Sequence, residues 1–216
     1  KTEDNKQKLE FPGEGRKPDQ IMQLMDEAGE KDANWRSGKT FSLVFYGGDD
    51  LSEVSQKAFL KYYYENGLNP TVFPSLRKFE TEVVAMSADL MNGDADVVGN
   101  MTSGGTESIL CAVKTAKHYA LDKNPNIKPQ MVVAQSVHPA FDKAAHYFGV
   151  EIIHIPVRED KRADVKAMEA AINENTVLIV GSAPSYPHGV MDPIEELAAV
   201  AKRKNVLMHV DACVGG

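Results

Sequence analysis

The spacing of apolar residues changes along the chain and separates two differently organised halves. In the first half, apolar residues three or four positions apart predict helices over 18–32, 52–66 and 75–91. From residue 105 onward, helical segments alternate with short apolar runs of the kind that form buried strands. The helices expected there are 105–121, 139–148, 164–174 and 193–204, and the expected strands are 131–135, 151–156, 177–181 and 206–210.

This alternation predicts an α/β fold, in which helices cover both faces of a mainly parallel sheet. Residues 1–17 are polar and contain Gly and Pro, so we expect an arm or linker there, and the Gly-rich stretch 35–48 indicates an irregular turn. The pair Asp192-Pro193, with Glu195 three residues after Asp192, is typical of a helix N-terminus. The helix 193–204 is therefore expected to be capped at Asp192.

Length and composition restrict the kind of protein. A chain of 216 residues with 43% hydrophobic residues is enough for one domain with a core. A net charge of −7 and a pI near 5.4 argue against nucleic-acid binding and against attraction to an acidic membrane surface. No run approaches the 18 apolar residues of a membrane span, and the charged N-terminus lacks an apolar signal core. We expect a cytoplasmic protein, although the start without Met is compatible with a missing upstream segment or anchor.

The segment Thr102–Ser108 carries the strongest chemical signal. It reads Thr-Ser-Gly-Gly-Thr-Glu-Ser and immediately precedes an apolar helical run. Free N–H groups and the helix dipole make such a helix N-terminus a binding site for phosphate. The loop has neither the Lys of a nucleotide P-loop nor the third Gly of a dinucleotide fingerprint, which favours a phosphorylated ligand other than a nucleotide. Taken alone, Gly104-Gly105-Thr106 is equally compatible with an ordinary tight turn and helix cap.

Two further candidates follow predicted strands, where ligands of parallel sheets bind. His138 comes after strand 131–135, and Asp211 comes after strand 206–210. A phosphate loop followed by these two residues predicts pyridoxal phosphate (PLP), with His138 stacked on the ring and Asp211 paired with its protonated nitrogen. Ser182, at the end of strand 177–181, is expected to face the cofactor.

Each of these residues also has a structural interpretation. His138 precedes Pro139, and this residue taken alone favours a neighbour of a helix cap, while Asp211 is alternatively a structural carboxylate or a metal ligand. The scattered histidines and the lack of a His-x-x-x-His pattern argue against a metal. His209 lies on the same strand face as Asp211, and its roles as core and as catalytic histidine stay open. Cys111 and Cys213 have no metal or redox spacing.

Taken together, these segments resemble the group II PLP-dependent decarboxylases, from about Ser42 to Gly216. The order and spacing of the segments make the resemblance specific. The matching segments are Phe73–Lys78, Thr102–Ser108, His138–Ala145, Pro187–Pro193 and His209–Gly216. The resemblance implies the aspartate aminotransferase-like fold type I, with residues 1–50 as an N-terminal arm and helix and residues 51–216 as the front portion of the PLP-binding large domain.

The resemblance also implies roles for individual residues. The cofactor phosphate would be held by the Gly-rich loop, chiefly by Gly105 and Thr106. An Asn-Pro-Leu-His pattern of the family, which binds substrate phosphate, corresponds here to Asn66-Gly67-Leu68-Asn69, so that Asn69 replaces the His. An amide can hydrogen-bond a phosphate but adds no charge. The expected cofactor-binding residues are Ser103, Gly104, Gly105, Thr106, His138, Ser182 and Asp211, those expected at the substrate are Tyr46, Asn66 and Asn69, and the two expected to be catalytic are His138 and Asp211.

The implied activity is that of a PLP-dependent carbon–carbon lyase acting on a phosphorylated sphingoid base. The products would be a fatty aldehyde and phosphoethanolamine, and the resemblance implies a homodimer. Amino-acid decarboxylation is the second hypothesis, which the Asn69 departure favours. The family's Schiff-base lysine lies a few tens of residues beyond the Asp-Ala-Cys motif, whereas this chain continues for only five residues after Asp211. We therefore expect the front portion of an enzyme, inactive by itself, or alternatively a non-catalytic PLP-fold fragment.

Overall fold

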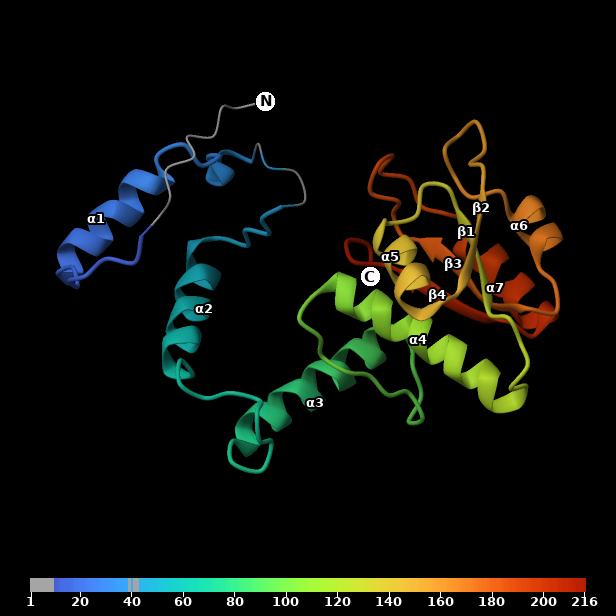
Figure 1. Ribbon diagram of the computed structural model, residues 1–216, viewed down its shortest axis with the longest axis horizontal. Helices are drawn as coiled ribbons and strands as arrows, with labels where there is room; N and C mark the ends of the chain where they lie inside the picture. The colour runs from blue at the N-terminus through green and yellow to red at the C-terminus, as the bar shows by residue number, and fades with distance from the viewer. Residues whose placement is uncertain (1–9, 39, 41–42) are drawn as a thin grey trace. The chain divides into compact units, whose positions relative to one another are not determined.

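A computed structural model describes residues 10–38, 40 and 43–216 (Figure 1). The chain forms two compact units, Lys1–Tyr63 and Tyr64–Gly216. The first nine residues of the expected arm lie outside the described residues, as does Ser42, where the expected family resemblance begins. The expected functional division at residue 50 stays a prediction.

The first unit is helical. It contains α1 (Pro18–Gly29), a short 3-10 helix (Trp35–Ser37) and α2 (Asp49–Lys61). The predicted helix 52–66 therefore begins and ends earlier than expected. Gly48, just before α2, has a φ of 111°, which glycine adopts readily. The carboxylates of Asp49 and Asp50 in the first turn interact favourably with the positive end of the helix dipole.

On the predicted helix 52–66, the sequence places Phe59, Tyr62 and Tyr63, which we expect in the core or in a subunit contact. Phe59 and Tyr63 are 68% and 62% exposed, so the core interpretation is wrong for this pair. Their rings pack edge to face with centroids 6.1 Å apart. The subunit-contact interpretation stays a prediction.

The second unit contains all the predicted strands and the remaining helices, within a few residues of the expected bounds. Its helices are α3 (Pro74–Leu90), α4 (Gly105–Lys123), α5 (Ala140–Phe148), α6 (Val165–Ala171) and α7 (Ile194–Lys204). Its strands are β1 (Gln130–Ala134), β2 (Glu151–Ile155), β3 (Thr176–Ser182) and β4 (Leu207–Asp211).

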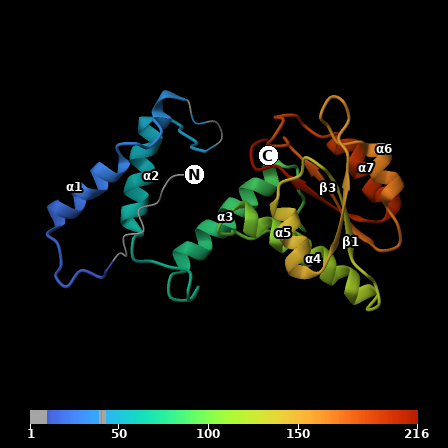
Figure 2. The same cartoon turned by 45° about the horizontal axis from the view of Figure 1, so that its top comes forward.

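The strands form one parallel sheet in the order β2-β1-β3-β4. The central strands β1 and β3 are buried along their whole length, which explains the apolar runs Met131–Ala134 and Val177–Val180 within them. On one face, α4 and α5 pack around Phe141 with Val133 and Val180, and on the other, α6 and α7 pack around Met168 with Val132 and Ile179. Figures 1 and 2 show these helix pairs on opposite sides of the strands. The predicted α/β architecture is confirmed.

The expected cap of α7 is wrong, although the helix begins where the sequence indicated. Pro193 occupies the N-cap position, and no side chain caps the helix there. The Asp192 carboxylate is buried and accepts hydrogen bonds from the N–H groups of Ala163 and Ser182 instead. By contrast, Asp164 caps α6 by accepting from the N–H of Ala167 at 3.0 Å.

No helix in the described part of the chain is both long enough and apolar enough to cross a membrane.

Candidate cofactor site

The predicted residues at strand ends meet at one edge of the sheet. Ser182 is the last residue of β3, and Asp211, the last residue of β4, lies opposite it in the parallel register. His138 follows the neighbouring strand β1 after a short turn. Since all the strands run in the same direction, these residues share the carboxyl edge, where parallel sheets bind ligands.

Helix α4 directs the Gly-rich loop to the same edge. Its last turn, with Ala120 and Lys123, lines a hollow together with Thr176 and Leu207, which begin β3 and β4. The C-terminal end of α4 therefore lies at the amino edge of the sheet. Because α4 packs along β3 and β4, its N-terminus at Gly105 points toward the carboxyl edge. The structure thus brings the predicted phosphate loop to the side of the sheet that carries His138 and Asp211.

In the Gly-rich loop, the backbone conformation requires glycine at Gly104, whereas Gly105 has open space beside it. Gly104 has φ 154° and ψ 175°, a conformation essentially restricted to glycine. A Cβ built on Gly105 would meet nothing within 4 Å, so the chain itself does not demand glycine there. The loop is solvent-exposed, and the first N–H groups of a helix have no acceptor within the helix. Space against a helix N-terminus is the geometry that a bound phosphate needs.

Polar side chains hold the loop in this shape. The Thr102 hydroxyl donates to the carbonyl of Gly104 at 3.1 Å and lies 2.7 Å from the Ser108 hydroxyl. Glu107 accepts the N–H of Ser103 at 2.6 Å. Hydrogen bonds from the hydroxyl and the N–H of Ser103 lower the pKa of Glu107. Glu107 is not among the predicted site residues, although a Glu in the first turn of a helix is a common N-terminal signal.

The imidazole of His138 is exposed and oriented by the backbone. Its Nδ1 accepts a hydrogen bond from the N–H of Ala140 at 3.1 Å. The neutral ring therefore carries its proton on Nε2. This local contact agrees with the expected proximity to a helix start, and the stacking role stays a prediction.

Asp211 and His209 lie half-buried on one face of β4. The His209 ring packs against the buried ring of Phe141, with centroids 5.7 Å apart and planes at 61°. Burial lowers the pKa of His209, and the Asp211 carboxylate only partly opposes this effect. His209 is thus neutral at neutral pH and leaves the negative charge of Asp211 without a cation from its own strand.

The two asparagines expected at the substrate are exposed and shape their own loop. Asn66 accepts the N–H of Leu68 at 3.1 Å, and Asn69 accepts from the N–H and the hydroxyl of Thr71 at 3.0 and 2.7 Å. These are turns in which the side chain replaces a backbone acceptor. Their substrate role stays a prediction.

Tyr46 belongs to the first unit and sits in a charged aromatic cluster. Its hydroxyl donates to Asp49 at 2.6 Å and accepts from Arg36 at 3.2 Å, while Arg36 also contacts Asp49 at 2.8 Å. The hydrogen bond to Asp49 raises the pKa of the Tyr46 hydroxyl. The guanidinium of Arg36 lies 4.6 Å from the ring centroid of Trp35 and 5.1 Å from that of Tyr46. Arg36 is not among the predicted site residues, and no sequence motif indicates its place in this cluster.

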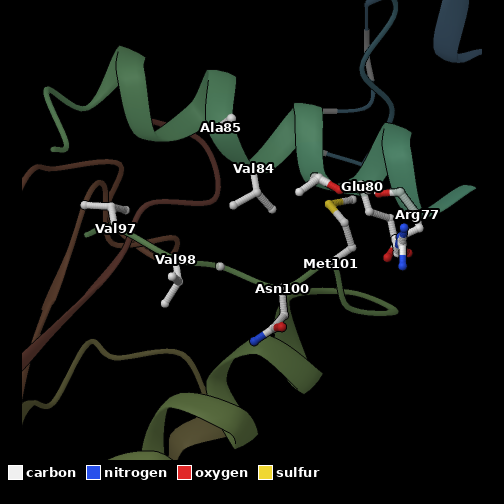
Figure 3. Close-up of a pocket in the computed structure, with 10 residues that line it drawn as sticks. Arg77, Glu80, Val84, Ala85, Val97, Val98, Asn100 and Met101 are labelled. Atoms are coloured by element: carbon white, nitrogen blue, oxygen red, sulfur yellow. Dashed lines mark hydrogen bonds between the residues drawn. The ribbon is translucent and has the colours of Figure 1, made fainter. Parts of the chain in front are cut away.

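A cavity of about 350 Å³ lies between α3 and the residues that lead into the Gly-rich loop. Figure 3 shows Val84 of α3 pointing toward this segment and Arg77 and Glu80 together at one end. The lining residues are Arg77, Glu80, Thr81, Val84 and Ala85 of α3 with Val97, Val98, Gly99, Asn100 and Met101. None of the predicted site residues lines this cavity, which borders the segment just before the Gly-rich loop.

The residues at the carboxyl edge fit PLP. The open space at Gly105 suits a phosphate, and Asp211 supplies the carboxylate for a ring nitrogen. Two buried hydroxyls in the described part of the chain lack a hydrogen-bond partner, those of Ser136 and Ser185. Both follow the carboxyl ends of strands, so polar groups without partners collect at this edge. No group of three or more His, Cys, Asp or Glu side chains in the described residues is arranged to hold a metal ion.

Residues 81–215 match the family model of the aminotransferase class-V proteins. The chain belongs to this family. The match begins within α3 and includes the Gly-rich loop and all four strands, and the expected resemblance is confirmed by the relatives that follow.

Sphingosine-1-phosphate lyase 1 of Mus musculus is 42% identical over 206 residues, which cover 95% of this chain and 36% of that protein. A probable L-aspartate decarboxylase of Pyrococcus furiosus is 32% identical over 208 residues, covering 96% of this chain and 54% of that protein. The solved structure of a sphingosine-1-phosphate lyase from Burkholderia pseudomallei superposes with a TM-score of 0.88 at 33% identity, covering 97% of this chain and 50% of that one. The chain thus spans about a third to a half of the length of these relatives.

Proposed function

We propose that the protein carrying this sequence is a PLP-dependent carbon–carbon lyase that cleaves sphingosine 1-phosphate to a fatty aldehyde and phosphoethanolamine. The observation that carries the proposal is that three predicted parts of the site lie at the same edge of the sheet. The start of α4, His138 and Asp211 come from distant parts of the chain and lie at the carboxyl edge of one sheet. The 42% identity to a sphingosine-1-phosphate lyase over 95% of the chain supports the choice of substrate.

The chain supplies three binding functions in this proposal. The N–H groups at the start of α4 hold the cofactor phosphate, helped by the Thr106 hydroxyl and the helix dipole. The imidazole of His138 covers one face of the pyridine ring. The Asp211 carboxylate holds a proton on the ring nitrogen, and its charge is not neutralised by the uncharged His209. Ser182 lies opposite Asp211 in the sheet and lines the same edge.

When bound, PLP supplies an electron sink for the electron pair released as the Cα–Cβ bond breaks. Asn66 and Asn69 hold the phosphate of the substrate through their amide groups, and Tyr46 lies near the substrate. Asn69 replaces a histidine of the family pattern, so positive charge at the substrate phosphate has to come from other residues.

Product analysis tests the proposed activity. The full-length gene product, reconstituted with PLP, is expected to release a long-chain aldehyde and phosphoethanolamine from sphingosine 1-phosphate. Mass spectrometry of both products measures the reaction. A protein that binds PLP but releases no aldehyde would contradict the proposed lyase activity.

Amino-acid α-decarboxylation is the second candidate. The neutral amide of Asn69 favours it, because an unphosphorylated substrate needs no cation there. The 32% identity to a probable L-aspartate decarboxylase points in the same direction. Release of labelled CO2 from an amino acid, without aldehyde from sphingosine 1-phosphate, would identify this reaction.

We also propose a homodimer that acts in the cytoplasm. The family resemblance supports the dimer, as does an exposed apolar row on α3 formed by Val83, Met86 and Leu90. Both cysteines are free and exposed, which supports the location in the reducing cytoplasm. Light scattering of the full-length gene product is expected to give twice the mass of one chain, and cell fractionation measures the location. A monomeric mass with full activity would contradict the dimer.

A further inference from the structure

A buried carboxylate joins three segments beside the candidate site. Asp192 is 4% exposed, and both of its carboxylate oxygens accept backbone hydrogen bonds. Oδ1 accepts from the N–H of Ala163 at 2.8 Å, and Oδ2 accepts from the N–H of Ser182 at 2.8 Å. Burial of a carboxylate is unfavourable unless hydrogen bonds compensate it. The carboxylate of Asp192 therefore ties the two N–H donors, and the segments that carry them, to one another.

Asp192 fixes the end of β3 from both sides. Its carboxylate binds the N–H of Ser182, and its own N–H donates to the Ser182 carbonyl at 3.0 Å. The last residue of β3 is therefore held through both of its backbone polar groups by one residue. This double contact restrains the point where β3 leaves the sheet.

The next residue of the chain transmits this restraint to Asp211. The N–H of Ala183 donates to the carbonyl of Asp211 at 2.8 Å, and the Ala183 carbonyl accepts from the N–H of Gly215 at 3.1 Å. A Cβ on Gly215 would approach the Ala183 oxygen to 2.6 Å, so the turn after Asp211 packs directly on Ala183. A continuous run of hydrogen bonds and one peptide link thus leads from the Asp192 carboxylate to the backbone of Asp211.

We propose that Asp192 is a positioning residue that sets the Asp211 carboxylate for the ring nitrogen of the cofactor. This inference rests on the proposed function, because it assigns Asp211 to PLP. Asp192 does not touch the cofactor in this scheme. It acts through Ser182 and Ala183, and it anchors them to the loop before α6 through Ala163.

The test replaces the carboxylate with an amide of nearly the same shape. In Asp192→Asn, the amide NH2 faces one of the two N–H donors and cannot accept from it. We expect the end of β3 to shift and the affinity of the full-length gene product for PLP to fall about tenfold. The kcat is expected to fall while the KM for substrate changes little, and the visible absorption of bound PLP is expected to titrate at a different pH.

Asp164→Asn is the matched control. Asp164 also accepts a backbone N–H, that of Ala167, but it caps α6, which packs against β1, β2 and α7. This variant is expected to lower the thermal stability while leaving the PLP affinity and absorption unchanged. Equal losses of PLP affinity in the two variants would overturn the proposal.

A double-mutant cycle separates positioning from general stability. If Asp192 acts through Asp211, Asp192→Asn should reduce PLP affinity by less than twofold in an Asp211→Asn background. An equal tenfold loss in both backgrounds would overturn the proposal, and so would an unchanged affinity in the single variant. If Asp192→Asn does not fold, Asp192→Glu, which retains the charge but displaces it, is measured in the same cycle with the same expectation. A wild-type protein that binds no PLP would instead refute the proposed function on which the inference rests.

Discussion

Gly105→Val separates the role of the Gly-rich loop in binding phosphate from its role in starting α4. A Cβ at residue 105 meets nothing within 4 Å, so the apoprotein accommodates a side chain there. Alanine is also a better helix former than glycine by about 1 kcal/mol, so helix propensity gives no reason for Gly105→Ala to destabilise the fold. The same side chain fills the space through which a phosphate approaches the helix N-terminus.

The expected loss of affinity follows from the hydrogen bonds that are blocked. One hydrogen bond to a charged group contributes about 1.5–3 kcal/mol. Since about 1.4 kcal/mol corresponds to a factor of ten, loss of one such bond weakens PLP binding about 10- to 150-fold. We expect the smaller effect for Gly105→Ala and the larger effect for Gly105→Val.

The assay is a PLP titration of the full-length apoprotein, followed by its absorbance, together with chemical unfolding without PLP. Gly104→Ala is the comparison variant. Gly104 has a φ of 154°, so a side chain there should destabilise the apoprotein by about 1–3 kcal/mol. If Gly105→Val binds PLP with wild-type affinity, the loop is a turn and the phosphate binds elsewhere.

Three further predictions concern the site. Asp211→Asn should lower the kcat for aldehyde release by several orders of magnitude in steady-state kinetics, because the charge at the ring nitrogen is lost. Asn69→His should maintain or raise lyase activity, through a lower KM near and below neutral pH, where a histidine with a pKa of about 6.5 is partly charged. In His209→Gln, the free energy of unfolding should fall less on acidification than in the wild type, as measured by urea unfolding between about pH 5 and 7. Burial lowers the pKa of His209 in the folded state, so protons bind the unfolded chain preferentially as the pH falls below about 6.5.

Each of these predictions has a contrary outcome. Near-normal turnover of Asp211→Asn would show that Asp211 does not pair with the ring nitrogen of PLP. Weaker substrate binding in Asn69→His, with CO2 released from an amino acid, would favour the decarboxylase. An identical pH dependence of unfolding in wild type and His209→Gln would show that His209 does not titrate differently in the folded state.

Much of the second unit could be predicted from sequence because periodicity and burial coincide there. β1 and β3 are apolar and flanked by polar turns, so their identity as buried strands was evident and their ends fell within about a residue of the prediction. The strand ends then placed His138 and Asp211 at one edge without any knowledge of the register. The first unit was less predictable, because α2 exposes Phe59 and Tyr63 and its bounds depend on Gly48.

Tertiary contacts explain what sequence reasoning missed. Asp192 precedes a proline and a helix, which is the local pattern of a cap, yet its carboxylate binds Ala163 and Ser182 from outside the helix. Neither partner is recognisable from sequence, because both donate through the backbone. Arg36 likewise gains its significance from Asp49 and Tyr46, which lie 13 and 10 residues away.

The all-parallel sheet also makes the candidate site depend on contacts between distant parts of the chain. Parallel neighbours need long connections, as in the pairing of Gln130 with Thr176, 46 residues apart. Contacts of this range form slowly, since the loop has to close before they stabilise it. In the described part of the chain, β4 pairs with β3, so the position of Asp211 depends on this long-range pairing. Binding of PLP should therefore require the completed β3–β4 pairing, and its absorbance should report that pairing in refolding experiments.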